Sequence, residues 1–276
     1  MTQPAWLTVH RGDAPLLVSL PHTGTDVPPE LLPRLVSPWL ARKDADWWID
    51  RLYAFAADLG ASTVHTALSR TALDVNRDPT GASLYPGRAT TELCPTTTFD
   101  GEPLYRDGRE PDAAEIAERR ARWFDPYHAA LDAEVARLKA RHRRVVVYDG
   151  HAIRSVVPRL FAGRLPVFNI GTDGGATCDP ALSDGVAKVC RGTGRSLVLN
   201  GRFRGGFITR RLGRPAEGVH AVQMELGCRA YLREPEGPVG EADWPAPYDA
   251  AFAAPVREAL ERVLGACLAF AREERP

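Results

Sequence analysis

Short apolar runs rich in β-branched residues alternate along this chain with segments whose apolar residues recur at the helical period. The clearest run, residues 145–148, reads Val-Val-Val-Tyr, and a second run, residues 16–20, stops at Pro21. Runs of this length and composition are typical of buried strands. Because strands that alternate with helices form sheets covered on both faces, the pattern predicts an α/β fold with a mixed, mostly parallel sheet.

Other segments follow the same two patterns. Further strands are predicted at residues 61–67, 166–170, 196–199 and 221–226, with a short extended segment at 72–75. Helices are predicted at residues 44–60, 112–124, 126–142, 180–191 and 248–272. No internal repeat or linker divides the chain, so we expect a single domain over residues 1–276. The segment 78–111, rich in Pro, Gly and Thr, predicts a long loop that covers the functional site.

The composition excludes several classes of partner and site. The 276 residues contain 35 Lys and Arg against 35 Asp and Glu, so no net charge would attract nucleic acid or an anionic membrane. The five cysteines form no C-x-x-C pair, which argues against disulfides or a thiolate zinc site and for a reducing compartment. No signal peptide is visible, and no apolar run approaches the roughly 18 residues that span a bilayer. The sequence therefore predicts a soluble, cytoplasmic protein.

Two histidines, His22 and His151, directly follow predicted strands beside glycine or proline. In open α/β sheets, ligands bind beyond the carboxyl ends of the strands, so we expect the two imidazoles to converge there. Two imidazoles with a carboxylate and an open water position form a catalytic zinc site. Structural histidines held by hydrogen bonds are the alternative.

Glu225 lies at the end of the apolar strand predicted at residues 221–226. A carboxylate in that position must be paired, or burial raises its pKa. A general base needs a pKa near the working pH, so Glu225 is the candidate base of a metal-dependent hydrolase. The alternative is a salt bridge to Arg229, Arg210 or Arg211.

Two arginines and an amide lie close together after the second predicted strand, as Arg70, Asn76 and Arg77. The planar guanidinium binds carboxylates through two hydrogen bonds, so in a protein without net charge this cluster predicts a small anionic substrate. Structural pairing of Arg77 with Asp74 or Asp78 is the alternative. No Gly-x-Ser-x-Gly motif supports a serine hydrolase, and the Gly-rich turns lack a phosphate-binding signature.

Taken together, these segments resemble the N-formylglutamate amidohydrolase (N-formylglutamate deformylase) family from Val18 to about Tyr231. Each motif is short, but their order along the chain is specific. The motifs are Ser19-Leu20-Pro21-His22-Thr23-Gly24, Asp44-Ala45-Asp46-Trp47, Asp50-Arg51-Leu52-Tyr53, Ser69-Arg70, Asp74-Val75-Asn76-Arg77, Leu84-Tyr85-Pro86-Gly87, Cys94-Pro95-Thr96-Thr97, Phe99-Asp100-Gly101, Pro126-Tyr127-His128, Asp149-Gly150-His151, Asn169-Ile170-Gly171-Thr172, Cys178-Asp179-Pro180, Gly205-Gly206-Phe207-Ile208-Thr209 and Gln223-Met224-Glu225-Leu226.

The family is similar to zinc carboxypeptidases and aspartoacylases, which implies a phosphorylase/hydrolase-like α/β fold. By this resemblance His22 and His151 bind zinc, Glu225 is the general base, and Asn76 with Arg77 holds a substrate carboxylate. The chain departs from carboxypeptidases in one position, because Thr25 stands where those enzymes have a ligating Glu.

The third metal ligand must therefore come from elsewhere in the chain. Asp46 is the expected one, and Asp44, Asp26 and Asp50 are the alternatives. The resemblance implies one divalent ion, zinc, although histidine and carboxylate ligands also suit iron, cobalt or nickel.

The reaction implied is hydrolysis of N-formyl-L-glutamate to formate and L-glutamate, the last step of one histidine-degradation route. Arg70 and Arg154 are further candidates for holding the two substrate carboxylates. A related N-acyl-amino-acid deacylase or a small zinc carboxypeptidase is the nearest alternative. A non-catalytic dicarboxylate-binding protein is the alternative from another class.

Overall fold

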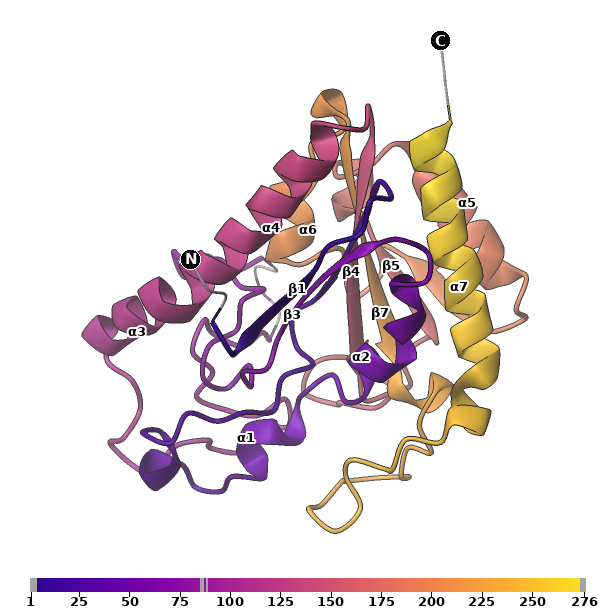
Figure 1. Ribbon diagram of the computed structural model, residues 1–276. Coiled ribbons are helices and arrows are strands. Elements are labelled where there is room, and N and C mark those ends of the chain that lie inside the picture. Colours follow the sequence, from indigo (N-terminus) through magenta and orange to yellow (C-terminus); the bar gives the residue numbers. More distant parts are fainter. Residues whose placement is uncertain (1–3, 85–86, 88, 274–276) are drawn as a thin grey trace.

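One seven-stranded sheet runs through the centre of the molecule (Figure 1). The structure is a computed structural model, and it describes residues 4–84, 87 and 89–273. In order across the sheet, the strands are β1 (Leu7–His10), β3 (Ser62–Thr66), β2 (Leu16–Leu20), β4 (Val145–Ile153), β7 (Val219–Gly227), β5 (Phe168–Gly171) and β6 (Leu197–Leu199). Four neighbouring pairs are parallel, and the pairs β1–β3 and β5–β7 are antiparallel. The predicted mixed, mostly parallel α/β sheet is therefore confirmed.

Helices cover both faces of this sheet. The helices are α1 (Leu40–Lys43), α2 (Ile49–Leu52), α3 (Ala113–Arg119), α4 (Asp125–Lys139), α5 (Pro180–Arg191), α6 (Phe207–Leu212) and α7 (Ala250–Arg272). The α4 and α6 helices lie on one face, and α5 and α7 on the other (Figure 1). Side chains of β4 alternate between the two cores, with Val145 and Val147 toward α4 and Val146 and Tyr148 toward α7.

The central strand β4 is longer than its apolar run predicts. All nine residues from Val145 to Ile153 are buried, so the strand continues through Asp149-Gly150-His151. His151 therefore lies within β4, and the expectation that it follows the strand is wrong. The continuation is stabilised by β7, which pairs with β4 over nine consecutive residues and places His151 directly opposite Glu225.

The helix predicted at residues 44–60 is interrupted. Only α2 and a single 3₁₀ turn, Ala54–Ala56, are helical there, because Trp48 has a left-handed backbone with φ of 63°. Two tertiary hydrogen bonds hold this conformation: Asp46 N–H donates to the His22 carbonyl at 2.9 Å, and the Trp48 ring N–H donates to the Ala246 carbonyl at 3.0 Å. Tertiary contacts thus override the helical pattern.

The two helices predicted at residues 112–124 and 126–142 are joined without a break. A π-helical turn, Arg120–Phe124, connects α3 to α4, and Pro126 occupies the first turn of α4. Proline has no N–H to donate and crowds the preceding turn, which a wider π turn accommodates. The sequence patterns also missed β1, α1 and α6, all of which are short.

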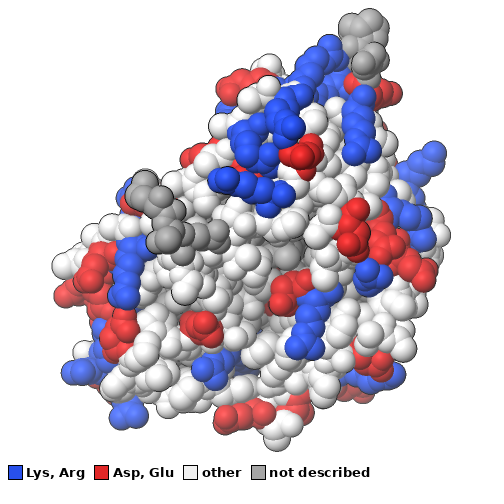
Figure 2. Space-filling model, in the orientation of Figure 1, with Lys and Arg blue, Asp and Glu red and all other residues white. Residues whose placement is uncertain are grey.

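Charged side chains of both signs are spread over the face shown in Figure 2, and the largest gathering of Lys and Arg lies at the top, over the end of α4. Within residues 4–84, 87 and 89–273, no helix has the length and hydropathy required to cross a membrane.

His128 is a buried histidine of α4 that packs between aromatic rings. Its ring centroid lies 4.1 Å from that of Phe124 and 5.4 Å from that of Phe207. Its Nε2 atom lies 2.8 Å from the Val75 carbonyl oxygen, to which it donates as the neutral ring. Burial, together with the nearby Arg211 cation, lowers the pKa of His128 to about 4.

This environment predicts a pH-dependent loss of stability. An unfolded histidine titrates near pH 6.5, so between that value and pH 4 the unfolded state binds a proton that the folded state does not. The free energy of unfolding should fall by about 3 kcal/mol across this window through His128 alone. Urea unfolding at about pH 7 and about pH 4.5 should therefore show a smaller pH dependence for His128→Gln than for the wild type. The matched variant of an exposed histidine, His10→Gln, should keep the wild-type dependence, and equal dependence in all three proteins would contradict the assignment.

Candidate active site

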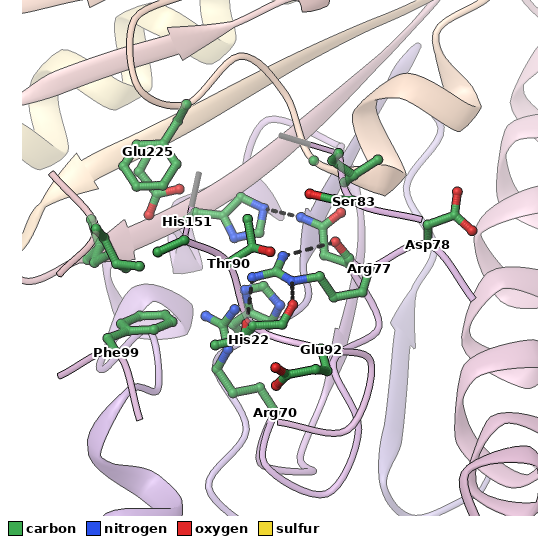
Figure 3. Close-up of a pocket in the computed structure, with 18 of the residues that line it drawn as sticks. His22, Arg70, Arg77, Asp78, Ser83, Thr90, Glu92, Phe99, His151 and Glu225 are labelled. Atoms are coloured by element: carbon green, nitrogen blue, oxygen red, sulfur yellow. Dashed lines mark hydrogen bonds between the residues drawn. The ribbon is translucent and has the colours of Figure 1, made fainter. Parts of the chain in front are cut away.

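A cavity of about 230 Å³ lies at the carboxyl ends of the central parallel strands. His22 reaches it from the turn after β2, His151 from β4 and Glu225 from β7. The predicted long loop forms another wall, through lining residues between Asp78 and Leu93. Figure 3 shows His22, His151 and Glu225 around the pocket, with Arg70 and Arg77 beside His22. Tyr85 and Pro86, which belong to one motif of the resemblance, lie outside the described residues.

His22, Asp46 and His151 form a buried cluster that could hold a metal ion, with one ligand atom from each within 4.8 Å of the others. The Asp46 Oδ2 atom lies 3.2 Å from His151 Nδ1 and 3.7 Å from His22 Nδ1. The two imidazole centroids are 4.9 Å apart. The structure therefore brings together the three residues that the sequence proposes as ligands.

The second nitrogen of each imidazole contacts a buried carboxylate. His22 Nε2 lies 2.7 Å from Asp74 Oδ1. His151 Nε2 lies 3.2 Å from Asp149 Oδ2 and 3.0 Å from Asn76 Nδ2, whose amide is oriented by the Ile208 N–H on Oδ1 and so presents its NH₂ group to the ring. At His22 the carboxylate on Nε2 orients the ring and makes Nδ1 a better ligand. At His151 the two contacts of Nε2 orient the ring, and both Nδ1 atoms face Asp46. Two such nitrogens and one carboxylate oxygen are the donor set of a catalytic zinc site, so these residues fit a divalent metal.

The alternative acidic ligand Asp44 has other partners. Its carboxylate accepts a hydrogen bond of 2.6 Å from the Phe99 N–H and lies 3.5 Å from the Arg154 guanidinium. Arg154 also pairs with Asp100 at 2.7 Å. Arg154 is not one of the described residues that line the cavity, so the structure does not bring it to the other substrate-binding candidates.

Asp74 is a fully buried carboxylate that links the histidine cluster to the arginines. It accepts hydrogen bonds from Arg70 Nη2 at 2.6 Å and from the Asn76 N–H at 2.9 Å, and lies 3.5 Å from Arg77. Burial alone would raise the pKa of Asp74, but the charges of Arg70 and Arg77 and the contact with His22 hold it well below its usual range. Asp74 is therefore ionised.

Arg70, Asn76 and Arg77, the three residues proposed from the sequence to hold a substrate carboxylate, all line the cavity. The Arg70 guanidinium lies over the Phe99 ring, 4.8 Å from its centroid. Arg77 Nε and Nη2 donate to the carbonyl and the hydroxyl of Thr91 at 3.0 and 2.9 Å. These contacts hold both guanidinium groups at the cavity wall, and the pairing of Arg77 with Asp74 is part of the same arrangement.

Glu225 lines the cavity and is 7% exposed. Burial raises the pKa of Glu225 to about 7, a shift that the neighbouring His151 partly offsets. Two of the arginines proposed as alternative partners are paired elsewhere, Arg210 with Asp173 at 3.4 Å and Arg211 with Asp132 at 2.9 Å. A carboxyl group in this state can both accept and donate a proton near neutral pH.

Several residues of the site were missed by sequence reasoning. Asp149 and Gln223 each lie two positions before a predicted site residue on the same strand, so the period of two could have placed them on the same face. Arg202 and Phe203 line the cavity from the loop after β6, where no pattern in the sequence indicates their direction.

The chain was compared with protein families, with characterised proteins and with solved structures. Residues 14–232 match the family model described as N-formylglutamate amidohydrolase. The N-formylglutamate deformylases of Pseudomonas aeruginosa and Pseudomonas putida are 46% and 42% identical to this chain over 268 residues, which is 97% of both chains in each case. The crystal structure of N-formylglutamate amidohydrolase from Ralstonia eutropha JMP134 shares the fold, with a TM-score of 0.79 at 24% identity over 98% of this chain and 99% of that chain. The family match over most of the sequence, together with relatives of this identity and coverage, shows that the chain belongs to the N-formylglutamate amidohydrolase family.

Proposed function

We propose that this protein is a metal-dependent amidohydrolase that cleaves N-formyl-L-glutamate to formate and L-glutamate. The observation that carries the proposal is the buried cluster of His22, Asp46 and His151 beside Glu225, in a cavity lined by arginines. The relatives named N-formylglutamate deformylase support the choice of substrate. The reaction would complete one route of histidine degradation.

His22 and His151, through their Nδ1 atoms, and Asp46 would hold a single divalent metal, which we propose to be zinc. When bound, a divalent metal acts as a Lewis acid toward an acyl oxygen and lowers the pKa of water. Asp74 beside His22, and Asn76 with Asp149 beside His151, keep the two imidazole rings in the orientation that directs Nδ1 toward Asp46.

Glu225 is the proposed general base and then the general acid. In its ionised form it takes a proton from the attacking water, and in its protonated form it gives that proton to the leaving amine of glutamate. Burial in the cavity brings the pKa of Glu225 to about 7, where both forms are populated. The pairing of β4 with β7 places this carboxylate next to the His151 position.

Arg77 is the proposed contact for a substrate carboxylate, with Asn76 and Arg70 beside it. The Thr91 carbonyl and hydroxyl hold the Arg77 guanidinium at the cavity wall, which reduces the entropy lost when a carboxylate binds. Arg202, which also lines the cavity, is a candidate for the second carboxylate. Arg154 supports the wall indirectly, because its partner Asp44 accepts the hydrogen bond from the Phe99 N–H.

Formate release from N-formyl-L-glutamate tests the proposed reaction. We expect turnover by the purified protein, loss of turnover after chelation, and recovery when Zn²⁺ is added back, because the cluster supplies metal ligands and no serine or thiol nucleophile is proposed. Circular dichroism of each preparation confirms that the fold is intact. Absence of formate from folded protein in all three states would overturn the proposed function.

Glu225→Gln should lower kcat by roughly 100- to 10,000-fold, the range typical of a lost general base. The amide keeps the size of the side chain, so the thermal unfolding midpoint and the bound metal should change little. An exposed control, Glu217→Gln, should retain wild-type kcat. A kcat within threefold of wild type in Glu225→Gln would remove this residue from the mechanism.

Arg77→Met should raise KM for N-formyl-L-glutamate by roughly 10- to 100-fold, because a charge-assisted hydrogen bond contributes about 1.5–3 kcal/mol. Arg154→Met provides the contrast. It removes the Arg154 cation from Asp44 and Asp100, of which Asp100 keeps a second cationic partner, Lys43 at 2.7 Å, so its thermal midpoint should fall while KM stays close to wild type. Steady-state kinetics on both variants shows which arginine binds the substrate carboxylate. A raised KM in Arg154→Met with an unchanged KM in Arg77→Met would make Arg154 the substrate contact.

A further inference from the structure

Gln223 is a buried amide on β7, two residues before Glu225 and on the same face of the strand. It is 3% exposed, and it lines the same cavity as Glu225. A buried amide has four hydrogen-bonding positions to fill, and leaving them unpaired is costly. Its partners therefore indicate what this side chain does.

The orientation of the Gln223 amide follows from one backbone hydrogen bond. The Gly206 N–H, which can only donate, lies 2.6 Å from Gln223 Oε1. This contact identifies Oε1 as the acceptor, so the other end of the amide is the NH₂ group. Gln223 Nε2 then donates to Glu225 Oε2 at 3.1 Å.

The hydrogen bond distinguishes the two oxygens of the Glu225 carboxylate. Oε2 is engaged by Gln223, whereas Oε1 accepts no hydrogen bond from residues 4–84, 87 and 89–273. The backbone of Glu225 is also held, because Asn169 Nδ2 donates to its carbonyl oxygen at 3.0 Å. One carboxylate oxygen and the backbone of Glu225 are thus both held, and Oε1 is the oxygen left for a reacting proton.

The turn that supplies the Gly206 N–H is itself tightly packed. A Cβ atom at Gly206 would lie 2.4 Å from Asn76 Nδ2, so only glycine fits there. Two residues later, the Ile208 N–H donates to Asn76 Oδ1 at 2.8 Å. Backbone N–H groups of residues 206–208 therefore orient two side-chain amides of the site, those of Gln223 and Asn76. Of these two amides, that of Gln223 contacts Glu225.

We propose that Gln223 is a positioning residue that acts through Glu225: its amide, oriented by the Gly206 N–H, holds the Glu225 carboxylate with Oε1 toward the reacting water. The inference rests on the proposed function of Glu225 as general base. A base fixed in one rotamer loses little entropy in reaching the transition state, and small misplacements of reacting groups have large effects on rate.

Gln223→Met tests this role, because methionine fills a similar volume without either hydrogen bond. We expect kcat for N-formyl-L-glutamate to fall roughly 10- to 100-fold with KM within about threefold of wild type. In the Glu225→Gln background, Gln223→Met should cause no further loss, since a residue that acts through the base has nothing left to position. An equal loss in both backgrounds, or a rise in KM with kcat unchanged, would overturn the proposal.

Two controls separate positioning from folding and from the proposed reaction. His220→Met removes a buried polar side chain from the same strand, where the ring accepts a hydrogen bond from the Asp179 N–H away from the cavity. Its thermal midpoint should fall without a change in kcat. If Glu225→Gln retains wild-type kcat, the proposed function of Glu225 fails. If Glu225→Gln is inactive but folded Gln223→Met keeps wild-type kcat, only the role of Gln223 fails.

Discussion

The nine-residue parallel pairing of β4 with β7 is the constraint on which the site depends. It places His151 directly opposite Glu225 and Asp149 opposite Gln223, so a ligand candidate, its carboxylate partner, the proposed base and the amide beside that base share one small area of the sheet. Side chains alternate between faces, and a slip of one residue would send half of this set into the opposite core. Since both strands are buried along their whole length, the hydrophobic effect fixes the register and thereby the chemistry.

Charge at the site is balanced locally among buried groups. Asp74 and Asp46 are almost completely buried, and each has a histidine and Arg70 within 4 Å. A buried carboxylate without such partners would be protonated or would destabilise the fold. The same pairing gives Arg70 a fixed position, so the protein without net charge still presents guanidinium groups to the cavity.

The strands with long apolar runs could be predicted, because burial on both faces leaves a clear trace in sequence, and these runs indicated His22 and His151 as site residues even though His151 lies within β4. The fold class and the approach of His22 and His151 follow from that trace. The break of the helix at Trp48 could not be predicted, since it depends on carbonyl groups of residues distant in the chain. Gln223 was missed for a related reason: its role depends on the Gly206 N–H, and the turn that carries this group has no periodic pattern. Arg154 shows the converse, because an arginine close in sequence to the site residue His151 pairs with distant carboxylates instead.

The π-helical turn between α3 and α4 determines in which directions side chains of the two helices point relative to each other. Side chains of both helices contact the segment 72–75, which carries Asp74. Arg119 of α3 donates to the Ala72 carbonyl at 2.9 Å, and His128 of α4 contacts the Val75 carbonyl. Two helical residues therefore hold the irregular segment 72–75 on either side of Leu73 and Asp74. Residues nine apart on a regular α-helix, at about 100° per residue, point in opposite directions. One residue inserted by the π turn removes about 100° of rotation and brings the two side chains to within roughly 80° of each other. Because of this π turn, side chains from both halves of one continuous helix can bind the two ends of the segment 72–75, whose Asp74 lies in the site.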